Sequence, residues 1–258
     1  MEPARQGLLL DRVVLVTGAG SGVGHGIAAA LASRGWKVAV NDVDADLAHE
    51  VAAEVDGVAV AGDAYTDAAT IVERCVEVCG RLDGLVNNAG KLRGGGLEAL
   101  RHDEVADVMN LNFEAALKLM QHCLPHLEVT KGAVVNITSL AAGASQAGTG
   151  VFGASKAALA SITRQAALEW GPRGVRVNAV APGFVRTARG EATSAGTDIW
   201  EQRRAVVPLR RIGTPADVGA VVAFLLSDDA GYVSGQAVVV DGGLAAVPVP
   251  GSPPADPE

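Results

Sequence analysis

Short apolar runs alternate with longer amphipathic segments along almost the whole chain. Seven of these runs are rich in valine, leucine, isoleucine and alanine, which is typical of strands buried in a parallel sheet. We expect strands at residues 12–17, 36–41, 57–63, 83–88, 132–139, 174–182 and 236–243. The pattern therefore predicts a sheet that is covered on both faces.

Segments with apolar residues at helical spacing separate these runs. Helices are expected from the first glycine-rich turn to about residue 34, from about residue 44, and over residues 67–80, 103–128, 150–170 and 214–227. Residues 186–207 are predicted to form a polar loop. Strands that alternate with helices form right-handed βαβ units. We therefore predict an α/β protein with a Rossmann-like, doubly wound seven-stranded parallel sheet flanked by helices.

The domain organisation is expected to be simple. No internal repeat and no linker divides the chain, and 258 residues suit one α/β domain. We predict a single domain over residues 1–245. Residues 246–258 form a proline-rich tail that we expect to be disordered or extended.

Composition and charge narrow the class of protein. With only three Trp, two Tyr and four Phe, small aliphatic side chains must fill the core. The net charge of −8 and the lack of a lysine or arginine run argue against nucleic acid and membrane surfaces as partners. The N-terminal segment has no adequate apolar core, so we expect no signal peptide, and no apolar stretch of about 20 residues suggests a membrane span. The three cysteines, Cys75, Cys79 and Cys123, lack metal-binding spacing. We expect a cytoplasmic protein with reduced thiols and no metal site.

A glycine-rich turn, TGAGSGVG at residues 17–24, directly follows the first strand and opens the first helix. Glycine at residues 18, 20, 22 and 24 removes side chains where a backbone must turn tightly and approach a diphosphate. The unpaired N–H groups at the start of the helix can then bind the anion. An ordinary tight turn could have this composition, but the strand–turn–helix order favours a dinucleotide site.

An acidic residue, Asp42, follows the second strand about 20 residues after this turn, where a carboxylate can accept hydrogen bonds from both ribose hydroxyls. The alternative is that Asp42 opens a helix, although Asp44 suits that role better. A carboxylate here would repel a 2′-phosphate, so NAD(H) is favoured over NADP(H). His25 is the one residue that could counter this preference, by contacting a phosphate when protonated.

Several further motifs occur in a fixed order along the chain. They are TGAGSGVG (17–24), Asp63, NNAG (87–90), Asn112, Ser139, SKAAL (155–159) and PGFVRT (182–187). Together with the C-terminal pattern that ends in VVVDGG, they resemble the short-chain dehydrogenase/reductase family. Within it, the chain is similar to the single-domain branch that includes bacterial 3-oxoacyl carrier-protein reductases. The resemblance covers residues 11–243.

The resemblance implies a complete nicotinamide cofactor site within the single domain. Asp63 with Ala64 would contact adenine, the residues after NN would lie under the nicotinamide ribose, and the PGFVRT segment would hold the carboxamide and a neighbouring phosphate. The NNAG segment could also be only a turn at a strand end. The expected cofactor-binding residues are Gly18, Gly20, Ser21, Gly22, Val23, Gly24, Asp42, Asp63, Ala64, Asn88, Ala89, Gly90, Lys156, Pro182, Gly183, Val185 and Thr187.

The resemblance also implies four catalytic positions, one of which is altered. Ser139 would bond the substrate oxygen, Lys156 would tune the proton donor and bind ribose, and Asn112 would hold a water relay. The remaining position belongs to a tyrosine in this family, but here it is Phe152, both by the spacing from Ser139 and by the YxxxK spacing from Lys156. Simple alternatives are a strand-end hydroxyl for Ser139 and a helix-capping amide for Asn112.

A phenyl ring cannot exchange a proton, and neither Tyr65 nor Tyr232 is expected near the site. Three explanations stay open. The phenylalanine replaced a tyrosine by design, or a natural enzyme takes its proton from Ser139, Lys156, water or substrate. Otherwise the protein binds the dinucleotide without redox turnover, as a sensor or a non-redox isomerase or cyclase. The leading prediction is an NAD(H)-dependent oxidoreductase that interconverts a secondary alcohol and a ketone.

Features around the predicted site leave the substrate undefined. Lys91 stands where this family commonly has an aliphatic residue, and it could meet an acidic group or simply face solvent. Arg186, Arg189 and Trp200 could contact a polar substrate or could be surface and core residues. We expect a small-molecule carbonyl or alcohol as substrate. The helices at 103–128 and 150–170 carry more Ala and Leu than one sheet face needs. The family resemblance implies that they pair across a two-fold axis, so we expect a homotetramer or homodimer.

Overall fold

The computed structural model describes residues 12–188, 190 and 197–246. A seven-stranded sheet forms its centre, in the order β3-β2-β1-β4-β5-β6-β7, and all neighbouring strands are parallel. The strands are β1 (Val13–Val16), β2 (Lys37–Val40), β3 (Val58–Ala59), β4 (Gly84–Asn87), β5 (Ala133–Ile137), β6 (Arg176–Pro182) and β7 (Ala237–Val240). The predicted doubly wound α/β sheet is confirmed. Of the predicted tail, 246–258, all but Ala246 lies outside the described residues.

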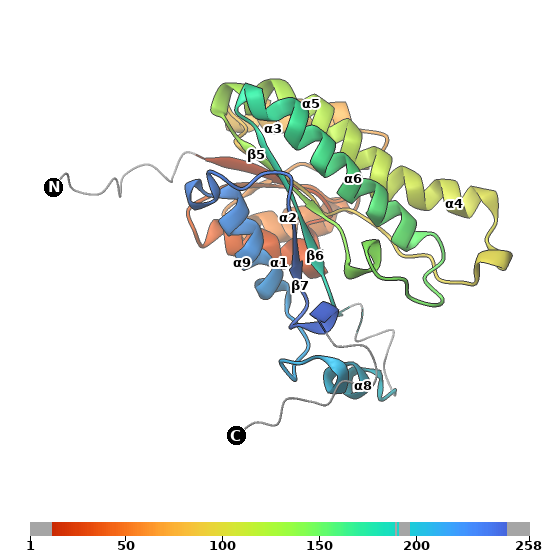
Figure 1. The fold of residues 1–258 in the computed structure, drawn as a ribbon. Coiled ribbons are helices and arrows are strands. Elements are labelled where there is room, and N and C mark those ends of the chain that lie inside the picture. The colour runs from red at the N-terminus through yellow and green to blue at the C-terminus, as the bar shows by residue number, and fades with distance from the viewer. Residues whose placement is uncertain (1–11, 189, 191–196, 247–258) are drawn as a thin grey trace.

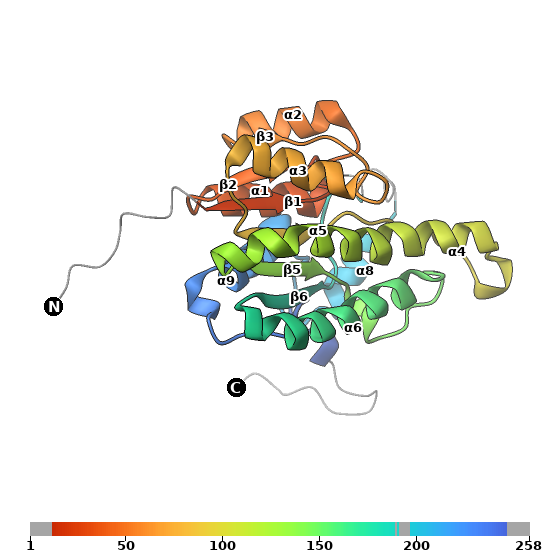
Figure 2. The same cartoon turned by 90° about the horizontal axis from the view of Figure 1, so that it is seen from above.

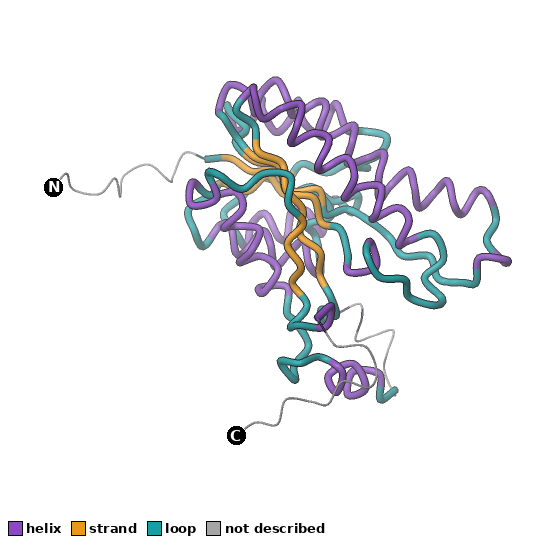
Figure 3. Tube along the Cα trace, viewed as in Figure 1, coloured by secondary structure: helices purple, strands orange, loops and turns teal. Residues whose placement is uncertain are grey.

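Helices cover both faces of the sheet (Figures 1 and 2). Helices α1, α2 and α9 pack on one face, and α3, α5 and α6 pack on the other. The main helices are α1 (Gly22–Ala32), α2 (Ala45–Glu54), α3 (Ala68–Cys79), α4 (His102–Met109), α5 (Ala115–Thr130), α6 (Phe152–Trp170), α8 (Ile199–Val206) and α9 (Pro215–Leu226). Figure 3 shows the strands as one inner layer between these helices.

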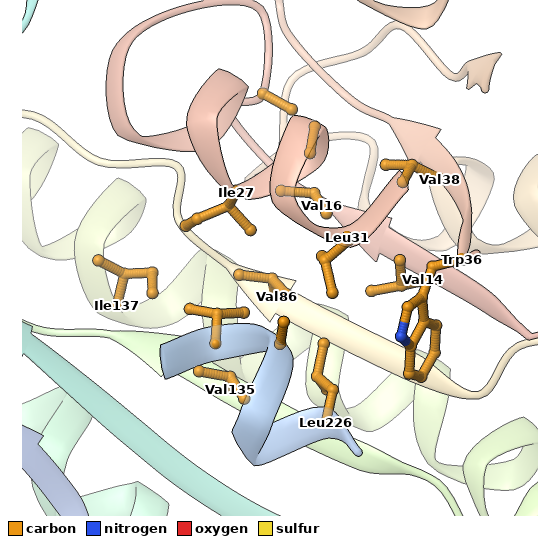
Figure 4. Packing of buried hydrophobic residues seen from close by; sticks show 14 of the residues in the cluster. Val14, Val16, Ile27, Leu31, Trp36, Val38, Val86, Val135, Ile137 and Leu226 are labelled. Atoms are coloured by element: carbon orange, nitrogen blue, oxygen red, sulfur yellow. The ribbon is translucent and has the colours of Figure 1, made fainter. Parts of the chain in front are cut away.

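The core consists of two apolar clusters, one on each face of the sheet. Side chains of a strand point alternately to opposite faces, so Val14 and Val16 join one cluster while Val13 and Leu15 join the other. The close-up in Figure 4 shows the first cluster, where Ile27 of α1 packs with Val14 and Val16. Small side chains thus fill the core, as the composition predicts.

The three cysteines lie on the second face. Cys75 and Cys123 are buried, Cys79 is partly buried, and all three are free thiols. Helix α3 supplies the first two and α5 the third. None of the helices in the described ranges is long and apolar enough to span a membrane.

Two sequence-based expectations about secondary structure need correction. The predicted polar loop at 186–207 contains helix α8, so that prediction is wrong for its second half. This helix is only eight residues long and has none of its residues buried, so it shows too little apolar periodicity to be found from sequence. Its end charges do fit a helix, with Glu201 in the first turn and Arg204 in the last. The third strand is also shorter than predicted, since only Val58–Ala59 is regular strand.

The long helix predicted at 103–128 is continuous but not uniform. A π-helical turn, Asn110–Glu114, joins α4 to α5. Turns of this kind are rare and frequently lie at functional sites. This one carries Asn112, which is buried.

The sheet has a topological switch point between β1 and β4. From β1 the chain adds strands in one direction, and from β4 it adds them in the other. Ligands of open α/β sheets bind in the crevice outside the carboxyl ends of the strands at such a point. The segments that follow β1, β4, β5 and β6 all emerge at this edge, and they carry most of the candidate residues.

Candidate active site

The glycine-rich turn after β1 has the conformation that its composition predicts. Gly18 and Gly22 have positive φ angles of 59° and 57°, which favour glycine. A Cβ atom at Gly24 would overlap the carbonyl oxygen of Gly18, so only glycine lets α1 start this close to the turn. Ser21 is exposed at the helix N-cap and its side chain caps no backbone N–H. The first N–H groups of α1 are thus available to an anion.

The turn is bonded to the segment after β4 through a residue that the sequence analysis did not single out. The Thr17 hydroxyl oxygen accepts hydrogen bonds from the N–H groups of Asn88 and Ala89, at 3.0 and 3.1 Å. In return, Asn88 Nδ2 donates to the carbonyl oxygens of Thr17 and Gly18, both at 2.9 Å. Thr17 is buried and comes directly before the first glycine. Its position before the turn is the only sequence signal for this role.

Asp42 is fixed beside the glycine-rich turn. Its carboxylate accepts hydrogen bonds from the N–H groups of Gly20, at 2.9 Å, and Asp44, at 3.1 Å. A Cβ atom at Gly20 would come within 2.8 Å of this carboxylate. Asp44, not Asp42, caps helix α2 by accepting from the N–H groups of residues 46 and 47. The helix-opening alternative for Asp42 is therefore wrong.

Val43 and His25 bear on the expected cofactor preference. Val43 follows it with 71% of its surface exposed. His25 Nε2 lies 3.0 Å from a carboxylate oxygen of Glu54, so its ring is already engaged by an acidic partner. His25 is thus poorly placed to offer its charge to a phosphate.

Asp63 and Ala64 lie further along the same edge, after β3. One carboxylate oxygen of Asp63 accepts hydrogen bonds from the N–H groups of Tyr65 and Thr66. Ala64 is buried. The backbone joins this segment to the end of β2, because the Gly62 N–H donates to the Asp42 carbonyl at 3.0 Å.

An open cleft of about 270 Å³ brings the remaining segments together. Ser139 follows β5, while Phe152 and Lys156 lie one turn apart at the start of α6. All three line the cleft, as do candidate cofactor residues from the segments after β1, β4 and β6. These cofactor residues are Val23, Asn88, Gly90, Pro182, Gly183, Val185 and Thr187. Within the described part of the chain, the other expected site residues do not line it; these are Gly18, Gly20, Ser21, Gly22, Gly24, Asp42, Asp63, Ala64, Ala89 and Asn112.

The Ser139 hydroxyl is oriented by its own segment. Its oxygen accepts a hydrogen bond from the Ala141 N–H at 3.1 Å. A hydroxyl that accepts one such bond still has its proton to donate. Ser139 is therefore available as a donor to an oxygen atom in the cleft.

Lys156 is buried, and Nζ donates a hydrogen bond to the Ile137 carbonyl at 2.8 Å. Burial lowers the pKa of this ammonium to about 8. The Phe152 ring centroid lies 5.9 Å from Nζ. A Cβ atom at Gly90 would lie 3.3 Å from the same nitrogen, so glycine leaves this ammonium accessible from the cleft.

Asn112 is bonded to residues on two of the segments that line the cleft. Its Nδ2 donates to the Lys91 carbonyl and its Oδ1 accepts from the Lys91 N–H, at 2.9 and 2.8 Å. Nδ2 also lies 2.9 Å from the hydroxyl of Ser155, which donates to the Phe152 carbonyl. Ser155 is a second residue that sequence analysis missed, since only the contacts of its hydroxyl reveal that it joins Asn112 to the start of α6.

The two tyrosines lie elsewhere. The Tyr65 ring packs under Lys118 Nζ, 3.8 Å from the ring centroid, and Tyr232 is fully exposed. Neither lines the cleft among the described residues.

The segment after β6 leads into helix α8. Arg186 and Arg203 lie 5.8 and 5.1 Å from the ring of Trp200, and Arg203 also lies 4.9 Å from the ring of Phe184. Arg189 falls outside the described residues. Two guanidinium groups thus meet the indole that sequence analysis proposed as a substrate contact.

Comparisons with known proteins identify the class to which this fold and cleft belong. A family model described as enoyl-(acyl carrier protein) reductase matches residues 18–245. An uncharacterized oxidoreductase from Thermotoga maritima is 33% identical over 92% of this chain and 98% of its own length. The 3-oxoacyl-acyl-carrier-protein reductase FabG of Staphylococcus aureus is 34% identical over 91% of this chain and 98% of its own.

Comparison with solved structures supports the same class. A 7α-hydroxysteroid dehydrogenase, solved with NADH and 7-oxo glycochenodeoxycholic acid, superposes with a TM-score of 0.85. It is 31% identical, and the match covers 91% of this chain and 94% of the other. The chain belongs to the short-chain dehydrogenase/reductase family, a family of oxidoreductases.

Proposed function

We propose that this protein is an NAD(H)-dependent oxidoreductase that interconverts a secondary alcohol and a ketone, with Phe152 at the proton-transfer position. One observation carries the proposal: Ser139, Phe152 and Lys156 line the same cleft as the candidate cofactor residues of three other segments. A hydroxyl that can bind a substrate oxygen and a buried lysine thus lie beside the candidate residues for the nicotinamide end of the cofactor. That combination suits hydride transfer to a carbonyl.

The cofactor would lie across the carboxyl edge of the sheet. Its diphosphate would meet the N-terminus of α1, with Gly18, Gly20 and Gly22 giving close backbone approach. Asp42 would accept hydrogen bonds from the adenosine ribose hydroxyls, and Val43 provides no cation for a 2′-phosphate. This favours NAD(H).

The rest of the cofactor would follow the remaining candidate residues. Adenine would contact the segment at Asp63 and Ala64. The nicotinamide ribose would meet Lys156 and the segment from Asn88 to Gly90. Val185 and Thr187 would lie beside the carboxamide and its neighbouring phosphate.

In the reductive direction, bound NADH would supply a hydride to the carbonyl carbon, and the carbonyl oxygen would gain a proton to give the alcohol. Ser139 would donate a hydrogen bond to that oxygen as negative charge develops on it. Phe152 has no proton to give. Lys156, with a pKa lowered to about 8, is the group best matched to supply one through Ser139 or a water molecule.

A second candidate is a dinucleotide-binding protein without redox turnover, acting as a sensor or a non-redox isomerase or cyclase. Phe152 favours it, because a positioned acid or base typically contributes about 10²–10⁴ in rate. Cofactor binding would survive this substitution, since the phenyl ring fills the same volume.

A turnover assay separates the two candidates. The protein is mixed with NADH and a panel of ketones, and both the loss of NADH and the formation of alcohol are followed. The oxidoreductase predicts equal amounts of both for at least one ketone. The Lys156→Met variant should show neither, while a distant Lys131→Met variant should behave as the original protein. NADH binding without turnover on any ketone supports the second candidate.

A further inference from the structure

A second lysine, Lys91, lines the cleft, and the proposed cofactor site does not use it. Lys91 and Lys156 both line the cleft, and no aspartate or glutamate is among its described lining residues. Two lysines without an acidic residue among the cleft-lining residues are unexpected in a chain of net charge −8. In the proposed cofactor site, the diphosphate meets α1 and the ribose meets Lys156, so Lys91 remains available to the substrate.

The backbone of Lys91 is held firmly. The Asn112 amide bonds both its N–H and its carbonyl group, and Asn112 is itself 1% exposed. Lys91 also follows directly on Gly90, where a Cβ atom would approach Lys156 Nζ within 3.3 Å. The root of the Lys91 side chain is therefore fixed next to the proposed reaction site.

The tip of Lys91 is already bound to a carboxylate. Its ammonium pairs with the Asp107 carboxylate on α4, and the two side chains are 36% and 54% exposed. Ion pairs this open to water contribute little stability. Another carboxylate can take the place of Asp107 at small cost, because the displaced aspartate regains water.

We infer that Lys91 selects substrates that carry a carboxylate near the reacting carbonyl, so that the cleft prefers oxo acids over neutral ketones. This inference rests on the proposed function. Ser139 would bind the ketone oxygen while Lys91 binds the acid group, which fixes the substrate at two points. Asp107 holds the Lys91 side chain until a substrate carboxylate replaces it.

The test compares matched charged and neutral probes on the protein loaded with NAD⁺, which supplies no hydride to a ketone, so that binding is measured without turnover. Acetoacetate is paired with acetoacetamide, and 4-oxopentanoate with 4-oxopentanamide, which cover two distances between carbonyl and acid. Their dissociation constants are measured by calorimetry, after NADH itself has been titrated. We expect the acid of at least one pair to bind at least tenfold more tightly than its amide.

Variants then assign this preference to Lys91. In Lys91→Met, the affinities for the acid and for the amide should lie within about twofold of each other, and the affinity for NADH should not fall. Asp107→Asn should keep or increase the preference, because it removes the competing carboxylate. Lys131→Met, an exposed lysine away from the cleft, should change nothing.

Each adverse result has a distinct meaning. If NADH binds but neither acid is preferred, or if Lys91→Met weakens the binding of acid and amide alike, the inference fails, and the turnover assay decides the proposed function separately. If Lys91→Met weakens NADH at least tenfold, the lysine serves the cofactor and the inference also fails. If NADH does not bind at all, the proposed function fails and the inference with it.

Discussion

At the scale of single residues, the proposed preference for NAD(H) depends most on Asp42. Its carboxylate is held in place by the N–H groups of Gly20 and Asp44, and it adjoins the glycine-rich turn. Because these donors are backbone groups, the carboxylate position does not depend on a neighbouring side chain. This geometry suits hydrogen bonds from two ribose hydroxyls and opposes a phosphate.

We therefore predict that NADH binds more tightly than NADPH, and that Asp42→Ala removes the preference. Loss of hydrogen bonds to a charged group costs about 1.5–3 kcal/mol, which corresponds to roughly 10- to 100-fold in NADH affinity. Calorimetric titration with both cofactors measures the ratio. Asp44→Ala is the control, since it removes the α2 cap at about 1 kcal/mol of stability and should leave the ratio unchanged. Equal affinities in the original protein would refute the role given to Asp42.

Lys156 gives a second prediction at this scale. Burial lowers the pKa of its ammonium from 10.5 to about 8, so between these pH values the unfolded chain holds a proton that the folded chain has lost. Stability conferred by the original residue should then rise with pH across this window. Relative to Lys156→Met, the original protein should gain about 3 kcal/mol of unfolding free energy from pH 7 to above pH 10.

Urea unfolding of both proteins at several pH values measures this difference. Comparing the two proteins cancels the titration of all other groups. A difference that stays constant with pH would mean that burial does not lower the pKa of Lys156, and it would remove the pKa match on which its role as proton source is proposed.

At the scale of elements, the sequence predicts the parts that burial controls. The strands and most helices follow from apolar periodicity, and the turn at 17–24 follows from glycine. Helix α8 was missed because it buries no side chain, and the π-helical turn at Asn110–Glu114 leaves no mark on the periodicity of a continuous helix. Hydrophobic periodicity reveals which residues are buried, so it misses an unburied helix and a local change of helix type.

In the candidate site too, the sequence predicted some residues and missed others. Motif order located Ser139, Phe152 and Lys156, and the structure brings them into one cleft. Thr17 and Ser155 escaped because their importance lies in hydrogen bonds across long sequence separations, of 71 and 43 residues. Such pairs form only when the sheet brings its strand ends together.

The close packing of α1 against α9 yields an element-scale prediction. A Cβ atom at Gly26 would overlap Pro215 at the start of α9, including its backbone. Gly26→Ala should therefore destabilise the protein by about 1–3 kcal/mol, as overpacking does. Gly171 has nothing within 4 Å of its Cβ position and a helical conformation, so Gly171→Ala should be neutral or stabilising by about 0.4–1 kcal/mol. Urea unfolding compares them, and equal effects would contradict this account of the helix contact.

At the scale of the whole molecule, exposed apolar residues on α5 and α6 support the expected assembly. Val129 and Leu168 are 84% and 74% exposed on these neighbouring helices. We predict a dimer or tetramer at micromolar concentration, and Leu168→Glu should weaken it. Val78→Glu, on α3, should have no effect. Analytical ultracentrifugation of the three proteins decides, and a monomeric original protein would contradict the prediction.

The central claim is that the cleft performs hydride transfer on a carbonyl, with Phe152 where a phenol would normally move the proton. A single-turnover measurement on an accepted ketone tests it most directly, using the NADH-loaded original protein, Phe152→Tyr and Ser139→Ala. If a tyrosine was replaced, Phe152→Tyr should raise the rate by roughly 10²-fold or more, with NADH affinity nearly unchanged. If the protein uses another proton source, Phe152→Tyr should be neutral or harmful and Ser139→Ala should be severe. A rate that neither substitution alters would contradict the claim, because the reaction would then occur outside this cleft.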